Sequence, residues 1–367
     1  MTLHRINVLT GMIACSIAWH AQAADTIFNL TADGGGIKVS NADKTINFQV
    51  GGRLQYDFDA TRSDDNGVDT QDFDVRRARL DVKGNAGDWG YKIQFNVAES
   101  DGSQGGSAED LYVQYSGFGK ASVLTIGKQQ EAFGLERVES DNDTASLERS
   151  AVTELLTPVR SAGVSVSGSG ARWSYSGGIY EGQGDGRDDF ARLAFTGRAT
   201  WSPYLAGTTV FHLGASYMNR PGSAALADLV VYGLEGAYSQ GPFHVQAEYL
   251  SGERGEQDLD GGYLEAGWTL TGEARPYAGG AFGRVAPAGR VGAWEVVARY
   301  EAGDGNYTDV GLTPVQIYDG RQYTAGLNWY ATRNARFGLS YMHGEAKDIT
   351  GHRFEGSEVR TRFQYVF

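Results

Sequence analysis

The amino-acid sequence predicts an all-β protein, a transmembrane antiparallel β-barrel of about 16 strands. Apolar and polar residues alternate along many segments, as they do where successive strand residues point to opposite faces of a sheet. The composition, with Gly 52, Tyr 20 and Phe 16 against Pro 7, is typical of aromatic strands joined by glycine-rich turns. The chain also ends inside such a strand, at Phe367, and closing a barrel would pair that edge. An ordinary buried C-terminal strand is the alternative for this last segment taken alone.

Residues 1–23 have the pattern of a cleaved signal peptide. A basic segment precedes an apolar run from Val8 to Trp19, and Ala21-Gln22-Ala23 supplies a small-residue cleavage site. A lipoprotein signal cleaved before Cys15 is the competing interpretation. No later apolar run approaches the roughly 20 residues that a membrane-spanning helix needs. Insertion is therefore expected through strands, in an outer membrane and in contact with its lipid.

We expect residues 24–45 to form a short N-terminal periplasmic segment and residues 46–367 to form the barrel. From Ile46 to Phe58 the apolar residues share one face, and polar residues such as Arg53 and Asp57 share the other. In a barrel the apolar face meets lipid and the polar face lines water. The expected strands span about 46–59, 73–84, 88–99, 109–117, 121–129, 162–169, 172–181, 189–201, 207–218, 228–239, 242–252, 261–271, 292–302, 320–331, 334–344 and 355–367.

Connection lengths provide an independent check, because outer-membrane barrels have short periplasmic turns and longer external loops. The even connections are short, for example residues 85–87 and 332–333, and the odd ones are longer and richer in Asp and Gly, for example residues 303–319. Residues 272–291 are an exception, because this connection is long although it lies on the side of the barrel where short turns are expected. Either this turn is extended, or the strands are miscounted there.

The third odd connection, about residues 130–161, is the longest. Loops of this length are usually functional or disordered. Its apolar residues favour an ordered segment that packs on the inner wall of the barrel, and a mobile external loop is the alternative; these residues are Phe133, Leu135, Val138, Leu147, Leu155 and Leu156.

Charged residues on the expected inner faces separate into a basic and an acidic wall. The basic wall is expected to carry an anion path of Arg53, Arg77, Arg79, Lys83, Lys92, Lys128, Arg360 and Arg362. The long loop adds Arg137, Arg149 and Arg160, and the opposing acidic wall consists of Glu235, Glu248, Glu265 and Glu295. Arginine suits anion passage because it stays charged and presents several donors to oxyanions. The alternative is that these arginines pair with lumenal carboxylates and brace the loop.

An ordered set of short motifs resembles the phosphate-selective porin O and P family of Gram-negative outer membranes. The motifs include Val50-Gly51-Gly52-Arg53-Leu54-Gln55, Arg76-Arg77-Ala78-Arg79-Leu80, Gly87-Asp88-Trp89-Gly90-Tyr91-Lys92, Leu147-Glu148-Arg149-Ser150 and Gly326-Leu327-Asn328-Trp329-Tyr330. The resemblance implies a trimeric 16-stranded barrel whose third loop folds inward as a constriction, and it accounts for the long connection near residue 280. It also implies passive diffusion of small hydrophilic solutes, with inorganic anions such as phosphate as the expected partners.

Other function classes have weak support. No catalytic or metal-ligand motif of the kind His-Glu-x-x-His or Gly-x-Ser-x-Gly occurs, so we expect no enzyme, cofactor or metal site. The formal charge of −13 argues against a nucleic-acid partner. A general diffusion porin without anion preference, a plugged structural or adhesive barrel, and an exported soluble β-protein remain alternatives. Because wall charges beside a narrow lumen are screened less than loop charges, we expect anion preference despite the acidic total.

Overall fold

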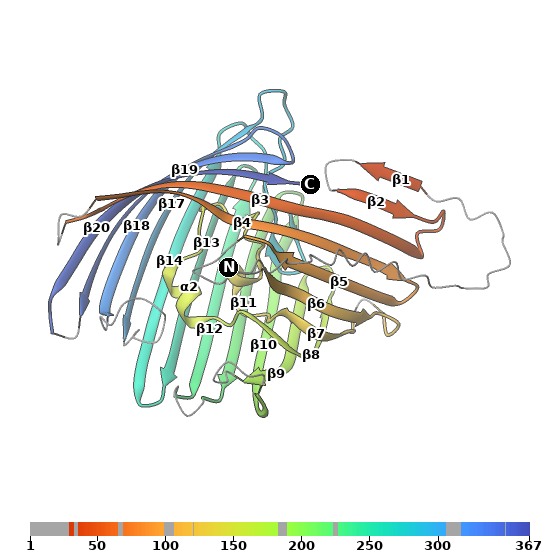
Figure 1. Ribbon diagram of the computed structural model, residues 1–367, viewed down its shortest axis with the longest axis horizontal. Helices are drawn as coiled ribbons and strands as arrows, with labels where there is room; N and C mark the ends of the chain where they lie inside the picture. The colour runs from red at the N-terminus through yellow and green to blue at the C-terminus, as the bar shows by residue number, and fades with distance from the viewer. Residues whose placement is uncertain are drawn as a thin grey trace, which may run out of the picture.

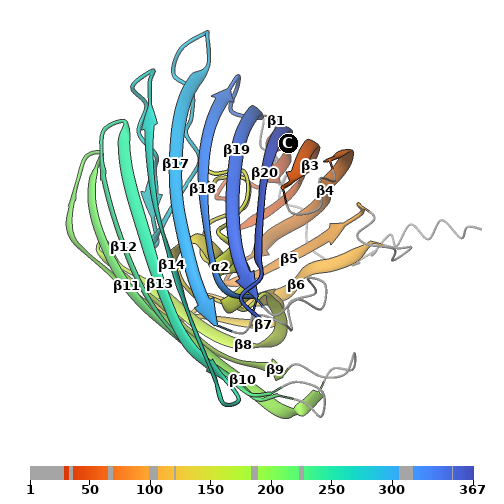
Figure 2. The ribbon, with the colours of Figure 1, turned by 90° about the vertical axis from the view of Figure 1, so that its left-hand side faces the viewer.

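A computed structural model describes residues 29–32, 36–64, 69–98, 106–119, 121–182, 189–222, 227–305, 317–348 and 350–367. The expected signal peptide, residues 1–23, lies outside the described residues. Sixteen antiparallel strands form the wall of a barrel, as predicted (Figures 1 and 2). They are β3 (Ile46–Ser63), β4 (Asp69–Ala86), β5 (Trp89–Asn96), β6 (Ser107–Tyr115), β7 (Val123–Gln130), β8 (Arg160–Ser169), β9 (Trp173–Gly182), β10 (Asp189–Ala206), β11 (Thr209–Arg220), β12 (Leu229–Gln240), β13 (Phe243–Arg254), β14 (Gln257–Thr269), β17 (Ala293–Gly305), β18 (Ile317–Tyr330), β19 (Ala335–Asp348) and β20 (Arg353–Val366).

The last strand closes the barrel against the first, as the sequence predicted. In the register of β20 with β3, Phe363 lies opposite Tyr56. The Phe367 amide donates to the Gly52 carbonyl at 3.0 Å, and the Gly52 amide donates to the Phe367 carbonyl at 2.8 Å. Phe363 and Tyr365 are exposed on the outer face, and Gln364 between them is buried in the lumen. Closure leaves neither terminal edge of the wall unpaired over these residues.

The outer face is apolar and the inner face is polar. Large apolar side chains exposed on the outside include Phe48, Leu80, Trp89, Phe95 and Leu234. Such an inverted arrangement suits a wall that contacts lipid outside and water inside. In the described part of the chain, no helix is long and apolar enough to cross a membrane.

Two regions differ from the simplest expectation. Within the segment 24–45, β1 (Asn29–Ala32) and β2 (Ile37–Ser40) form a hairpin, and β2 pairs with the start of β3. The connection 272–291 is an extended turn that contains the short hairpin of β15 (Tyr277–Ala278) and β16 (Ala281–Phe282). The strand count was therefore right, and the long connection is an extended turn and not the result of miscounted strands.

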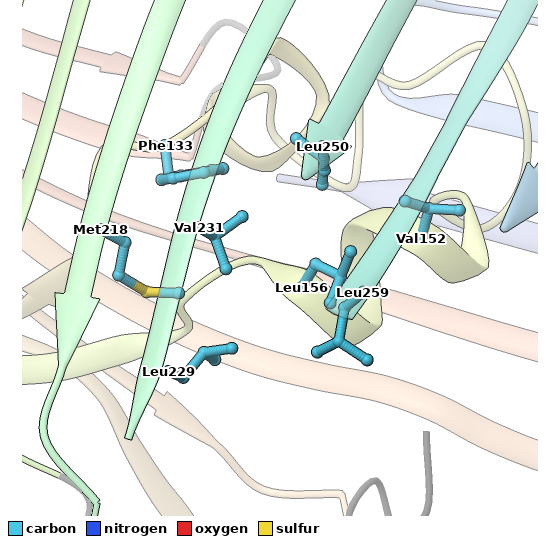
Figure 3. Packing of buried hydrophobic residues seen from close by; sticks show 8 residues of the cluster. All are labelled: Phe133, Val152, Leu156, Met218, Leu229, Val231, Leu250 and Leu259. Atoms are coloured by element: carbon cyan, nitrogen blue, oxygen red, sulfur yellow. The ribbon is translucent and has the colours of Figure 1, made fainter. Parts of the chain in front are cut away.

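The third connection folds into the barrel and carries α1 (Leu135–Val138) and α2 (Ala151–Leu156). We call residues 131–159, between β7 and β8, the inward loop. The Ser150 side chain caps α2 by accepting a hydrogen bond from the Thr153 amide. Figure 2 shows α2 inside the ring of strands. Figure 3 shows how the inward loop packs on the wall: its contacts involve Phe133, Val152 and Leu156 against Met218, Leu229, Val231, Leu250 and Leu259. The prediction of an ordered loop on the inner wall is confirmed.

Candidate functional site

Asp141 of the inward loop sits among arginines of the first two wall strands. Its carboxylate lies 3.2 Å from Nη2 of Arg53 and 3.0 Å from Nε of Arg77, and 3.6 Å from Nη1 of Arg79. All three arginines are buried on the inner face, as the sequence predicted. Burial alone would raise the pKa of Asp141, but Arg53, Arg77 and Arg79 outweigh it and hold that pKa well below its usual range. The loop acid therefore stays ionised between these arginines.

Glu148, farther along the inward loop, forms a second centre of the same kind. Its carboxylate accepts from Arg76 at 2.9 Å and from Arg77 at 3.4 Å. Arg360 approaches it to 3.6 Å, and Arg362 contacts both Glu148 and Asp57. Burial opposes ionisation, yet Arg77, Arg362 and Arg76 hold the pKa of Glu148 well below its usual range. The arginines of the expected anion path thus brace the loop, which was the alternative reading of the same residues.

Arg76 reaches this centre because of a β-bulge that the sequence analysis missed. Gln55 pairs with Arg77 and Asp57 pairs with Asp74, so β4 has one residue more than β3 between these pairs. A bulge of this kind lets two consecutive side chains point to one face. Strict alternation with Arg77 and Arg79 inside would place Arg76 outside. The consecutive Arg76-Arg77 pair, which puts one charge on a lipid face, was the signal that could have revealed it.

The four glutamates of the expected acidic wall face inward and are buried against other parts of the protein. Glu248 accepts hydrogen bonds from the backbone amides of Leu135 and Glu136 at 2.9 and 2.6 Å. Glu265 accepts from Ser146 at 2.5 Å. Each therefore holds the inward loop, and all four are buried, the other two being Glu235 and Glu295.

Alternation already places Arg299 on the inner face among these glutamates, whereas Arg336 and Arg198 were not singled out from the sequence. Arg336 donates to the carbonyls of Thr144 and Ala145 at 2.8 and 2.7 Å. Arg299 donates to Glu265 at 2.6 Å and also contacts Glu136 of α1. Arg336 and Arg198 lie on the inner faces of their strands, so the alternation of inward and outward residues could have revealed them. Arg198 forms a buried ion pair with Glu235.

The extended turn 272–291 also contacts the inward loop. Arg275 donates to the Asp143 carbonyl at 3.0 Å and lies 3.4 Å from the Glu139 carboxylate. The Phe282 amide donates to the same carboxylate at 3.2 Å. Burial, partly offset by Arg275, raises the pKa of Glu139 to about 7. Alternation rules cannot find such a contact, because Arg275 and Glu139 both lie outside strands.

A cavity of about 510 Å³ lies between the inward loop and the wall of β3 to β9. Cationic lining residues outnumber the carboxylates by six to four: Arg53, Lys83, Lys92, Arg137, Arg149 and Arg160 against Asp81, Asp110, Glu139 and Asp141. Lys92 and Arg160 both contact Asp110, at 2.5 and 2.7 Å. Arg137 and Arg149 donate mainly to atoms of the inward loop itself, such as Thr153 and Glu136.

Lys128 is the one predicted path residue that does not face the lumen. In the register of β6 with β7 it lies opposite Leu111, and Ile126 on the same face is exposed on the outer wall. Its expected place in the anion path is therefore wrong. Among the described residues, no three His, Cys, Asp or Glu side chains gather as a metal site would require.

The sequence matches the family described as "Phosphate-selective porin O and P" over residues 48–222 and 219–367. It is 28% identical to Porin O of Pseudomonas aeruginosa, over 97% of this chain and 98% of that protein. In fold it is similar to an anion-selective porin from Comamonas acidovorans, with a TM-score of 0.63 at 12% identity over 88% of this chain and 100% of that one. The outer membrane channel DcaP of Acinetobacter baumannii is similar with a TM-score of 0.62 at 13% identity, over 88% of this chain and 97% of that one. The chain is thus an outer-membrane porin, not an enzyme, and belongs to the phosphate-selective porin O and P family.

Proposed function

We propose that this porin mediates passive diffusion of small inorganic anions, phosphate among them. The observation that carries the proposal is the lining of the 510 Å³ cavity, in which six cationic side chains face four carboxylates. Close to a low-dielectric wall these charges are screened less than charges in outer loops. The names of the matched family and of the porin from Comamonas acidovorans are in keeping with anion passage.

Paired arginines suit permeation better than free ones. An anion held by several unpaired guanidinium groups would leave slowly, whereas conduction requires binding weak enough for release. Asp141 and Glu148 offset part of the arginine charge, and Lys83 and Lys92 continue the basic lining on neighbouring strands. An anion can then pass from one donor to the next without a single deep binding site.

Reversal potentials in a salt gradient test the proposal directly. The wild-type channel in a planar bilayer should prefer chloride over potassium, and added phosphate should reduce the chloride current. The double variant R77Q/R79Q removes two lumenal charges and should shift the reversal potential toward cations and weaken the phosphate block. Arg62→Gln, at an exposed position on β3, is the matched control. A cation-selective wild-type channel would contradict anion passage and leave a general diffusion porin, whereas a silent barrel would indicate a plugged one.

We also propose that the protein assembles as a homotrimer, as the family resemblance implies. Reconstituted protein should close in three equal conductance steps, and single-step closure would contradict this assembly.

Export through a cleaved signal peptide is a further part of the proposal. The apolar run before Ala21-Gln22-Ala23 supports it. Mass spectrometry of the outer-membrane protein should give an N-terminus at Ala24. An intact N-terminus, or a lipid-modified Cys15, would contradict this cleavage.

A further inference from the structure

A second cavity, of about 400 Å³, lies on the other side of the inward loop. It is enclosed by α2 and by the ends of β3, β17, β18, β19 and β20 that lead into the longer connections. It shares no lining residue with the 510 Å³ cavity described above. The two cavities therefore present different chemistry to a solute.

Four glycines line this second cavity. Gly303 pairs with Gly320, and Gly344 pairs with Gly356, on adjacent strands. All four lie on the same face as the buried Glu301, because each is separated from a buried, inward-facing residue of its strand by an even number of positions. A Cβ added at Gly344 would have its nearest neighbours 3.7 to 3.9 Å away, which is ordinary contact. A side chain could therefore be added at Gly344 without a clash, whereas at Gly356 it would meet the Arg62 carbonyl oxygen at 3.0 Å.

Apolar side chains face this wall. Val152 and Leu155 come from α2, and Phe354 comes from β20. A flat wall on one side and aliphatic side chains on the other form a slot, which we call the α2 slot. A planar aromatic ring buries its faces well in such a slot, because rings carry large apolar area at small conformational cost.

Glu301 gives the α2 slot its charge. Its Oε1 accepts a hydrogen bond from the Ala151 amide at 3.1 Å, while its Oε2 has no hydrogen-bond partner among the described residues. The side chain is 2% exposed. The neighbouring charged residues Arg321 and Glu345 form an ion pair with each other on the outer face. Arg62 and Glu355 also line the cavity, but they alternate with inward-facing neighbours and lie on the outer face. Among the described lining residues, Glu301 is therefore the one charged side chain on the inner face.

We propose that the α2 slot binds small planar organic cations, of the aryl amidinium or aryl ammonium class. A buried carboxylate oxygen without a donor is costly, and a ligand that supplies a charged N–H group removes that cost. The ring of the ligand would lie between the glycine wall and Val152 and Leu155, with its cationic group toward Glu301. Such a ligand differs in charge from the anions assigned to the first cavity, so the two proposals can fail independently.

Benzamidinium is a suitable probe, because it joins a planar ring to a cation that donates several hydrogen bonds. Its binding to the full-length barrel in detergent micelles can be measured by isothermal titration calorimetry, which does not depend on conductance. Guanidinium provides the charge without the ring, and benzamide provides the ring without the charge. We expect benzamidinium to bind at least about tenfold more tightly than either, as loss of a charged hydrogen bond or of a buried ring costs about that factor.

Two variants locate the site. Glu301→Gln keeps an oxygen for the Ala151 amide but removes the charge, and should weaken benzamidinium binding at least about tenfold. Gly344→Leu fills the slot and should abolish benzamidinium binding. If E301Q does not fold, this second variant still tests whether the ligand binds in the slot. Glu345→Gln, next to Gly344 on β19 but on the outer face, should change affinity less than about twofold.

Three results would overturn the proposal. Wild-type protein that does not bind benzamidinium at millimolar concentration has no such site. Equal affinity for benzamidinium and guanidinium would mean that the apolar slot contributes nothing. Binding that both E301Q and G344L retain would place the ligand elsewhere. Heat-dependent mobility of the folded barrel on gels confirms that each variant is folded before titration.

Discussion

The carboxylate of Asp141, between α1 and α2 in the inward loop, lies 3.0 Å from the guanidinium of Arg77 on the barrel wall. The same carboxylate contacts Arg53 and Arg79, so one loop residue binds three wall arginines. The inward loop thereby places a negative charge among the arginines of the wall.

Asp141→Asn should increase anion preference. The substitution frees Arg53, Arg77 and Arg79 from their shared carboxylate. A unit charge about 4 Å from the path changes a solute's energy by roughly 1 kcal/mol in water, and salt reduces this value. The ratio of anion to cation permeability should therefore rise about two- to fivefold, measured by reversal potential. Asp88→Asn, in a short turn, makes the same change in total charge and should have little effect. A fall in the ratio would mean that Asp141 is needed to hold the passage open.

Glu148→Gln should loosen the inward loop. Glu148 receives Arg76, Arg77, Arg360 and Arg362, and removing it leaves several buried cations less compensated. Breaking a buried pair costs about 3–5 kcal/mol, and the 19% exposure of Glu148 lowers the expected loss to about 2 kcal/mol. The temperature at which the barrel unfolds in detergent should fall, and single-channel current should become noisier. Glu154→Gln, at a more exposed position of the same loop, is the control. Unchanged noise and stability would show that the loop is held by its apolar contacts alone.

Acidification should raise anion preference through Glu139. Burial raises the pKa of this residue to about 7 against a usual value of 4.5, so its charge is lost as pH falls from 8 to 6. The 510 Å³ cavity then loses one negative charge, while Asp141 and Glu148, with lowered pKa values, stay ionised. Reversal potentials at pH 8 and pH 6 should differ in the wild type and agree more closely in Glu139→Gln.

The same pKa shift has a defined sign for stability. Between pH 4.5 and 7 the folded state binds a proton at Glu139 that the unfolded chain does not, so stability through this group increases as pH falls across that window. Asp141 and Glu148 act in the opposite sense. Folding lowers their pKa values, so the stability that they contribute is lost as pH falls below their usual pKa range. If the pH response persists unchanged in E139Q, it arises from other titratable groups.

Lys128 and Lys83 should respond differently to the same substitution. Lys83 lines the 510 Å³ cavity, whereas Lys128 lies on the outer face opposite Leu111. Lys83→Gln should lower the ratio of anion to cation permeability up to about fivefold, by the Coulomb argument used for Asp141. Lys128→Gln should leave the ratio unchanged. An equal effect of the two substitutions would contradict the register assigned to β7.

The sequence by itself determined the barrel and most of its inner wall. Alternation fixes which side chains share a face, so Arg53, Arg79 and Arg362 could be placed inside before any contact was known. The apolar residues of the long connection, such as Phe133 and Leu156, likewise required a surface to pack on, and the wall supplied it. These are local or periodic properties, so they can be predicted without knowing which distant residues each side chain contacts.

The tertiary structure alone decided what the charges do. Asp141 and Glu148 lie in a loop without strand periodicity, so nothing in the sequence pairs them with β3, β4 and β20. The bulge that turns Arg76 inward depends on the register of β4 against β3, and the contact of Arg275 with Glu139 joins two separate connections. Electrostatic interaction falls with distance rather than with sequence separation, and only the closed barrel brings these groups within reach.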